Sequence, residues 1–228
     1  RQANRVCIYG QLLLTDLIEK LEPYCEITQS NTDGVLVKLR SEDDFDLIDD
    51  IAWEWEKRTH LSLEFTEFKR VYQKDVNNYV MIGTDGHVKT KGAYVKKLNP
   101  LDNNLPILNT ALVNYFVNNI PVEDTINDCD DLEQFQLIAK LSSKYKYLLL
   151  NGEILNERCV RAFASKKDTD GGLLKVHCVT GRPAKFPNSP EKCFIFNDNI
   201  KNVKAPEYLD KQWYIDMAKK RLKQFGVS

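Results

Sequence analysis

The sequence contains no apolar run long enough to span a membrane, no internal repeat and no low-complexity segment. It also has no initiating Met and no signal-peptide pattern of basic, apolar and small-residue regions. None of its six cysteines forms a C-x-x-C pair, so reduced thiols fit better than a zinc site or disulfides. We therefore expect a segment of a longer cytoplasmic polypeptide that has no membrane partner.

The charged residues are divided unevenly along the 228-residue chain, although its formal net charge is only −1. Residues 1–131 hold 14 Lys and Arg against 23 Asp and Glu, whereas residues 132–228 hold 18 against 10. A hydrophobic content of 43% is typical of a soluble protein with one large domain or two smaller ones. The basic half is a candidate for binding an anionic partner such as nucleic acid, and the alternative is a solvated basic face.

The most informative stretch is a predicted hairpin, in which Asn31-Thr32-Asp33-Gly34 separates two runs of alternating apolar residues. Asn and Gly at this turn are expected to supply positive φ angles, and the flanking strands are expected to be buried. The Asp33 carboxylate then lies at the tip of the hairpin. Two interpretations follow: Asp33 is an ordinary turn residue, or it is a metal ligand held rigidly at a sheet edge.

The pattern of the first 99 residues predicts two helices, a strand and a second hairpin, at 1–22, 43–58, 61–73 and 76–95. The second hairpin turns at Gly83-Thr84-Asp85-Gly86, where Asp85 is interpreted as turn chemistry only. This order predicts an α+β fold, with an antiparallel sheet that carries helices on one face.

A polar stretch rich in helix breakers, at 99–104, predicts a boundary between domains 1–99 and 100–228. We expect the second domain to be mostly helical. Its predicted helices are 106–119, 122–128, 153–165 and 208–225, with short strands at 173–179 and 193–197.

Four stretches resemble motifs of family B DNA polymerases, in the family's order and closest to its phage-type branch. Gln29-Ser30-Asn31-Thr32-Asp33-Gly34 resembles the C motif, commonly written D-T-D-G. Leu61–Phe65 followed by Phe68-Lys69-Arg70 is similar to the strand entering the lower palm, and Asn77–Ile82 stands where the family has K-x-Y. Asp85–Gly92 matches D-G-x-x-x-x-[KR]-G. By this resemblance, residues 1–99 are the C-terminal half of the polymerase palm and residues 100–228 are the thumb.

The resemblance implies a DNA-directed DNA polymerase of DNA replication, with nucleotidyl transfer to a primer 3′-hydroxyl assisted by two Mg²⁺ ions. Asp33 would be a metal ligand within the catalytic motif Asn31, Thr32 and Asp33. The A-motif Asp and the fingers would lie upstream of Arg1, so we expect this chain alone to be inactive. The implied partners are primer–template DNA and dNTPs, bound by a monomer.

DNA contacts are also expected. By the resemblance, Tyr79 and Asn78 face the primer end, whereas a Tyr in an alternating strand otherwise indicates a core residue. Gly92 would let the backbone approach a phosphate that Lys91 neutralises. The candidates for phosphate contacts elsewhere are Lys69, Arg70, Lys166, Lys167, Lys175, Arg182 and Lys185.

Two residues depart from the family's pattern. Asn31 stands where the family has the first Asp of its C motif, and Asn78 stands where a Lys precedes the motif Tyr. Both replacements remove a charge that the reaction would use. They favour an alternative function, a polymerase-derived nucleic-acid-binding module that has lost catalysis.

Overall fold

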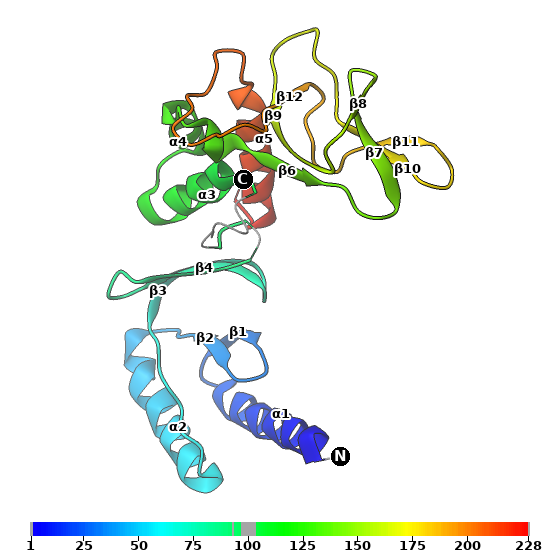
Figure 1. Cartoon of the computed structure of the whole chain (residues 1–228). Helices are drawn as coiled ribbons and strands as arrows, with labels where there is room; N and C mark the ends of the chain where they lie inside the picture. The colour runs from blue at the N-terminus through cyan, green and yellow to red at the C-terminus, as the bar shows by residue number, and fades with distance from the viewer. Residues whose placement is uncertain (1, 93, 97–103, 228) are drawn as a thin grey trace. The chain divides into compact units, whose positions relative to one another are not determined.

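The computed structural model describes residues 2–92, 94–96 and 104–227, and the chain forms two compact units, residues 1–68 and 69–228 (Figure 1). The first unit carries 7 Lys and Arg against 15 Asp and Glu, and the second carries 25 against 18. The first unit is therefore acidic and the second is basic. Among the described residues, none of the helices combines the length and apolar character that a membrane crossing requires.

The first unit packs two helices and a hairpin around a small core. Its elements are α1 (Gln2–Leu21), β1 (Glu26–Ser30), β2 (Val35–Lys38), the 3-10 helix η1 (Glu42–Asp44) and α2 (Phe45–Thr59). Buried Leu17, Ile48 and Trp55 join the helices, and apolar side chains of the hairpin pack against them. The indole N–H of Trp55 also donates to the Leu13 carbonyl oxygen at 3.1 Å, which holds α2 to α1.

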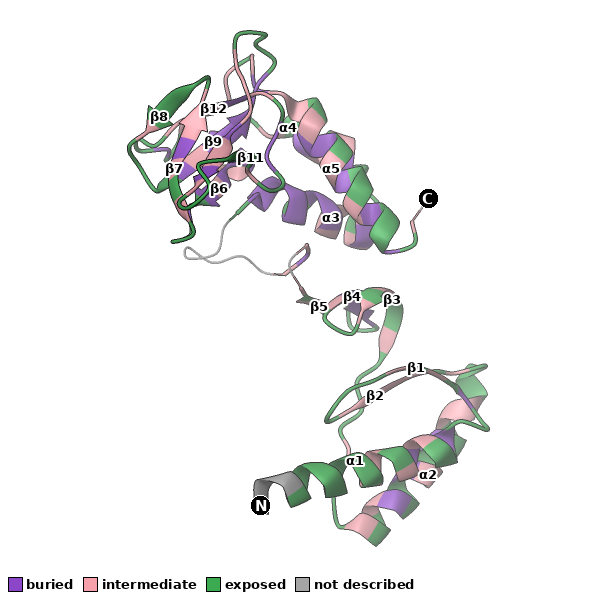
Figure 2. Cartoon of the chain, turned by 90° about the vertical axis from the view of Figure 1, so that its right-hand side faces the viewer, coloured by how far each residue is buried: buried purple, intermediate pink, exposed green. Residues whose placement is uncertain are grey.

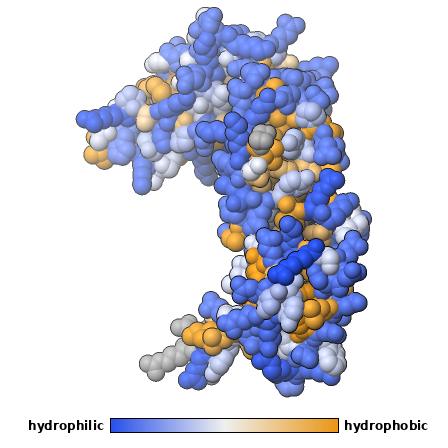
Figure 3. Space-filling view, turned by 180° about the vertical axis from the view of Figure 1, so that it is seen from behind, coloured by the Kyte–Doolittle hydropathy of each residue, from blue (hydrophilic) through white to orange (hydrophobic). Residues whose placement is uncertain are grey.

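Only the C-terminal half of α1 is packed, although its apolar spacing runs along the whole helix. Leu17 and Leu21 are buried, whereas the apolar side chains nearer the N-terminus are 54–73% exposed; these are Val6, Ile8, Tyr9 and Leu12. Figure 3 shows hydrophobic side chains at the surface at this end of the helix.

A three-stranded antiparallel meander begins at the unit boundary, with strands β3 (Phe68–Asp75), β4 (Asn78–Gly83) and β5 (Val88–Lys91). Val80 of the central strand β4 is buried in the main core of the second unit. The ring of Tyr72 lies 4.6 Å from that of Phe116, on helix α3 (Pro106–Asn118). The meander therefore packs with the elements that follow it in the sequence.

The single antiparallel sheet predicted for residues 1–99 is instead two sheets, β1–β2 and β3–β4–β5. The predicted strand at 61–73 begins only at Phe68, since residues 61–67 form no strand. Most of the predicted domain boundary, residues 99–103, lies outside the described residues.

The rest of the second unit contains both helices and sheets. Its elements are α3, α4 (Val122–Asp128), the 3-10 helix η2 (Leu132–Phe135), β6 (Leu137–Lys140), β7 (Tyr145–Leu150), β8 (Glu153–Leu155), β9 (Cys159–Ala164), β10 (Leu174–His177), β11 (Pro183–Lys185), β12 (Cys193–Ile195) and α5 (Lys211–Gln224). The strands form two antiparallel sheets, ordered β11-β10-β7-β8 and β12-β9-β6. Figure 2 shows that buried residues concentrate on α3, α5 and the sheet that contains β9.

The prediction of a mostly helical second domain is therefore wrong, although the α+β class holds. Seven strands stand beside three α-helices in the described part of 100–228, and the segment predicted as a helix at 153–165 forms β8 and β9. The Ala and Arg residues of this segment favour a helix when considered in isolation. In the structure, however, β9 is the central strand between β6 and β12. Strand pairing and burial of Val160 and Ala162 outweigh that local preference.

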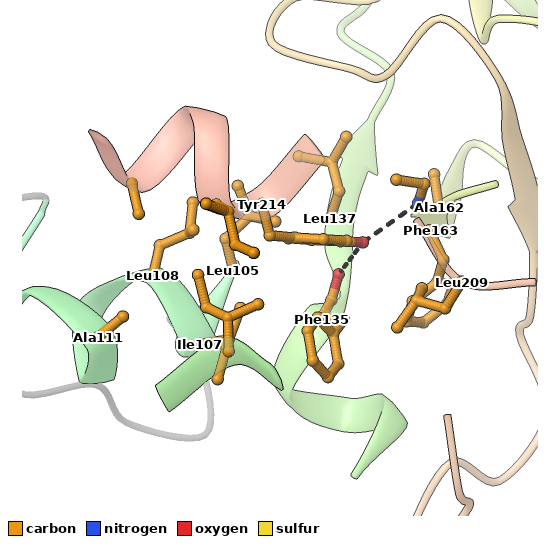
Figure 4. Packing of buried hydrophobic residues seen from close by; sticks show 14 of the residues in the cluster. Leu105, Ile107, Leu108, Ala111, Phe135, Leu137, Ala162, Phe163, Leu209 and Tyr214 are labelled. Carbon is orange, nitrogen blue, oxygen red and sulfur yellow. Dashed lines mark hydrogen bonds between the residues drawn. The ribbon is translucent and has the colours of Figure 1, made fainter. Parts of the chain in front are cut away.

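Tyr214 of α5 lies at the centre of the main core (Figure 4). Its side chain is fully buried, and its hydroxyl donates to the Phe135 carbonyl oxygen at 2.8 Å. The same hydroxyl accepts from the Ala164 backbone N–H at 3.1 Å. One side chain thus joins α5 to both η2 and β9.

We expect Tyr214→Phe to reduce the free energy of unfolding by about 1–3 kcal/mol, because it leaves two buried backbone groups without their partner. Urea unfolding followed by far-UV circular dichroism measures the change. Tyr147→Phe is the matched control, since the Tyr147 hydroxyl has no hydrogen-bond partner within the described ranges. Equal effects of the two substitutions would contradict the bridging role of Tyr214.

Candidate functional site

The tip of the β1–β2 hairpin is a four-residue loop closed by the pair Ser30 and Val35. The Asn31 side-chain oxygen accepts from the Asp33 backbone N–H at 3.1 Å, and the Asn31 N–H donates to the Gly34 carbonyl oxygen at 3.0 Å. Neither Asn31 nor Gly34 has a positive φ, so the expected turn geometry is wrong. The loop instead uses an Asn side chain to stabilise the turn, as four-residue connections can. The flanking strands are half-buried or exposed, not buried as expected.

The Asp33 carboxylate is exposed and takes no part in holding this turn. Its one hydrogen bond among the described residues is accepted from the neighbouring Thr32 hydroxyl at 3.4 Å. Asp85, on the second hairpin, behaves differently, because its carboxylate accepts from the His87 N–H at 2.8 Å. Asn31 and Asp85 therefore perform turn chemistry in their hairpins, and Asp33 does not.

A divalent metal ion would find only part of a site here. Mg²⁺ takes about six oxygen ligands, and Asp33 supplies one carboxylate, with the Thr32 hydroxyl beside it. No group of three or more His, Cys, Asp or Glu that could hold a metal exists in the part of the chain that the structure describes. Asp33 and Thr32 alone therefore supply too few oxygen atoms to hold a magnesium ion.

The β3–β4–β5 meander uses the predicted primer-facing residues for its own packing. Tyr79 is 8% exposed and lies opposite Lys91 in the β4–β5 register. The Asn78 side-chain amide donates to both carboxylate oxygens of Asp75, at 2.8 and 3.0 Å. These bonds, together with one from the Asn77 backbone, hold the pKa of Asp75 below its usual value.

The packing of the meander explains why residue 92 is a glycine. Its φ is +102°, and a Cβ there would lie 2.6 Å from the Asn77 carbonyl oxygen and clash with the Asn78 side chain. The glycine is thus required for close packing on the β3–β4 turn. Lys91, like Lys69 and Arg70 on β3, has an exposed side chain and no acidic partner among the described residues.

The basic residues predicted in the second half fall into two groups. Lys175 lies on β10, with Arg182 and Lys185 at the neighbouring strand β11, whereas Lys166 and Lys167 follow β9 of the other sheet. Lys185 is ion-paired with Glu191 at 3.0 Å. The Lys167 ammonium lies 3.6 Å from the centre of the Tyr208 ring, while Lys166 is exposed.

Sequence reasoning missed the partners of Lys175. Its ammonium lies 4.2 Å from the ring centre of Tyr145 on β7, and that ring contacts His177 edge-on at 5.7 Å. The alternation Lys144-Tyr145-Lys146-Tyr147 in the sequence indicates such contacts, because it interleaves cations with aromatic rings.

The six cysteines form no disulfide with one another, and Cys25 and Cys193 are buried. Burial raises the pKa of Cys193 to about 11 and also raises those of Cys25 and Cys129. These three thiols stay protonated at neutral pH and are poor nucleophiles.

Comparison with protein-family models and with curated protein sequences finds no match to this chain.

Proposed function

We propose that the chain is part of a template-directed DNA polymerase and that Asp33 contributes one ligand to its catalytic metal site. The observation that carries this proposal is the division of roles between Asn31 and Asp33. Asn31 holds the turn, and the Asp33 carboxylate faces solvent without an ion pair in the described ranges. A carboxylate that the fold does not use is available to a cation.

Bound Mg²⁺ ions would neutralise the charge that develops on the transferred phosphoryl group and position the attacking 3′-hydroxyl. Asp33 would hold such an ion from a hairpin whose backbone is fixed by the Asn31 hydrogen bonds. One carboxylate cannot hold two ions. The proposal therefore includes a second carboxylate from another segment of the parent enzyme, as the family resemblance implies.

The second unit would hold primer–template DNA. Its surplus of basic residues, 25 against 18 acidic ones, suits a polyanion. Exposed Lys69, Arg70 and Lys91 on the meander are available to phosphates. Tyr79 is buried on the central strand β4 and would support the strands β3 and β5 that carry them. Contacts of this kind hold any DNA sequence in place without reading its bases.

A non-catalytic nucleic-acid-binding module is the second candidate. Asn31 and Asn78 stand where the family has charged residues, and each amide has a role within the fold. Asn31 holds the hairpin tip, and Asn78 holds the β3–β4 turn through Asp75. This candidate predicts that the Asp33 carboxylate has no role in nucleotide incorporation.

Asp33→Asn in the parent enzyme separates the two candidates. The substitution keeps side-chain volume and leaves the Asn31 hydrogen bonds in place, so we expect an unchanged melting temperature. It removes a negative charge from a cation site, which costs several kcal/mol in the transition state. We expect single-turnover nucleotide incorporation to fall at least ~10³-fold, with DNA affinity retained.

Asp85→Asn is the matched control, because Asp85 is also an exposed hairpin-turn carboxylate. We expect it to lower the melting temperature slightly and to leave incorporation within about threefold of the wild type. If the two variants gave the same incorporation rate, the metal-ligand role of Asp33 would be refuted.

Binding of the 228-residue chain to primer–template DNA should depend steeply on salt and not on sequence. If six to ten phosphates are contacted, as is typical, affinity falls by about 10³–10⁵-fold between 50 and 200 mM salt. Fluorescence anisotropy with two unrelated primer–template sequences measures both properties. A flat salt response, or a strong preference for one sequence, would contradict the assignment of the second unit to the DNA backbone.

A further inference from the structure

The cations of the second unit differ in what they contact. Several form ion pairs with carboxylates, at 2.5–3.5 Å: Lys185 with Glu191, Lys192 with Asp168, Lys204 with Asp130 and Lys219 with Glu123. On β7, β10 and the turn after β10, the structure describes no such pair for Lys146, Lys175 or Arg182. Lys175 and Lys146 instead lie near the rings of Tyr145 and Tyr147, at 4.2 and 5.9 Å. Carboxylates of the described residues therefore do not neutralise the charges of Lys146, Lys175 and Arg182.

Strand pairing and backbone hydrogen bonds bring together residues from β7, β10 and the turn after β10. Tyr145 of β7 lies opposite His177 of β10 in the strand register. The His177 N–H in turn donates to the Arg182 carbonyl oxygen at 3.2 Å. Lys175 reaches the same Tyr145 ring from β10. We call Tyr145, Lys175, His177 and Arg182 the β7–β10 cluster.

Backbone contacts fix the position of the cluster. The Arg158 guanidinium donates to the carbonyl oxygens of Ser142, Tyr145 and Lys146, at 3.1–3.2 Å, and so holds the start of β7. The His177 Nδ1 accepts from two backbone N–H groups of the β10–β11 turn, at 3.2 and 3.4 Å. These bonds fix the orientation of the imidazole ring beside Tyr145.

We propose that the β7–β10 cluster, with the adjacent Lys146, binds single-stranded nucleic acid. Unneutralised cations suit phosphates, and half-buried aromatic rings between them suit bases that are not stacked in a duplex. A duplex offers its phosphates but hides its base faces. The proposal rests on the proposed function, since it assigns the unpaired strand of a primer–template to this sheet.

The test measures binding of the 228-residue chain to fluorescein-labelled oligo(dT) of about 16 nucleotides, the upper site size of one stacking module. The variant Lys146→Gln/Lys175→Gln/Arg182→Gln should lose at least ~10-fold in affinity at 50 mM salt. Each lost contact to a single strand lowers the slope of log affinity against log salt by about 0.7, so the slope should fall by about 2. Tyr145→Leu should also lose about fivefold or more, because stacking on the ring is removed.

The matched control is Lys192→Gln/Lys204→Gln/Lys219→Gln, which removes the same charge from ion-paired lysines. We expect its oligo(dT) affinity to stay within about twofold of the wild type. Equal losses in both triple variants would overturn the proposal in favour of a general charge effect. Tighter binding of a duplex of the same length, lost in the cluster variant, would overturn the single-strand assignment. Oligo(dT) binding involves no catalysis, whereas the catalytic proposal is tested by nucleotide incorporation, so failure of one proposal is distinguishable from failure of the other.

Discussion

The hydroxyl of Tyr214 joins elements that lie 50 and 79 residues away from it in the sequence, and the second unit is arranged around this contact. The groups it bonds, the Ala164 N–H and the Phe135 carbonyl, need a partner because burial removes them from water. Burial also raises the pKa of Tyr214, so the hydroxyl remains a neutral donor and acceptor. A separate bond holds the residues that follow β9, because the Lys166 N–H donates to the Tyr208 carbonyl oxygen at 2.8 Å.

Helices with strong apolar spacing could be predicted from the sequence, and so could hairpins with clear turn signals. Helix α2 and helix α3 lie within about two residues of their predicted bounds, and the turn at Gly83–Gly86 joins β4 to β5 as expected. The segment 153–165 was predicted wrongly because its two strands depend on partner strands outside the segment: β8 pairs with β7, and β9 pairs with β6 and β12. The prediction for 61–67 failed for the converse reason, since alternation without a partner strand makes no sheet.

The candidate site shows the same division between local and tertiary information. The sequence places Asp33 at a hairpin tip, but it cannot show which of two neighbouring polar side chains holds the turn. In the structure Asn31 holds the turn, and the Asp33 carboxylate is exposed to solvent. At Gly92 the sequence suggested a functional role, and the structure shows a packing role. The missing side chain was expected to make room for a phosphate, but the Asn77 carbonyl oxygen already occupies that space.

Net charge alone does not identify a nucleic-acid surface, because the partner of each cation decides whether its charge is available. Lys175 and Lys185 lie on adjacent strands of one sheet, yet of these two only Lys185 contacts a carboxylate of a described residue. A phosphate that binds Lys185 must first displace Glu191, whereas one that binds Lys175 meets an ammonium already held above Tyr145. An aromatic ring can therefore orient a lysine without neutralising it, which a carboxylate cannot do. The alternation of Lys and Tyr from 144 to 147 encodes this arrangement locally, but His177 and Arg182 join it only through the strand register.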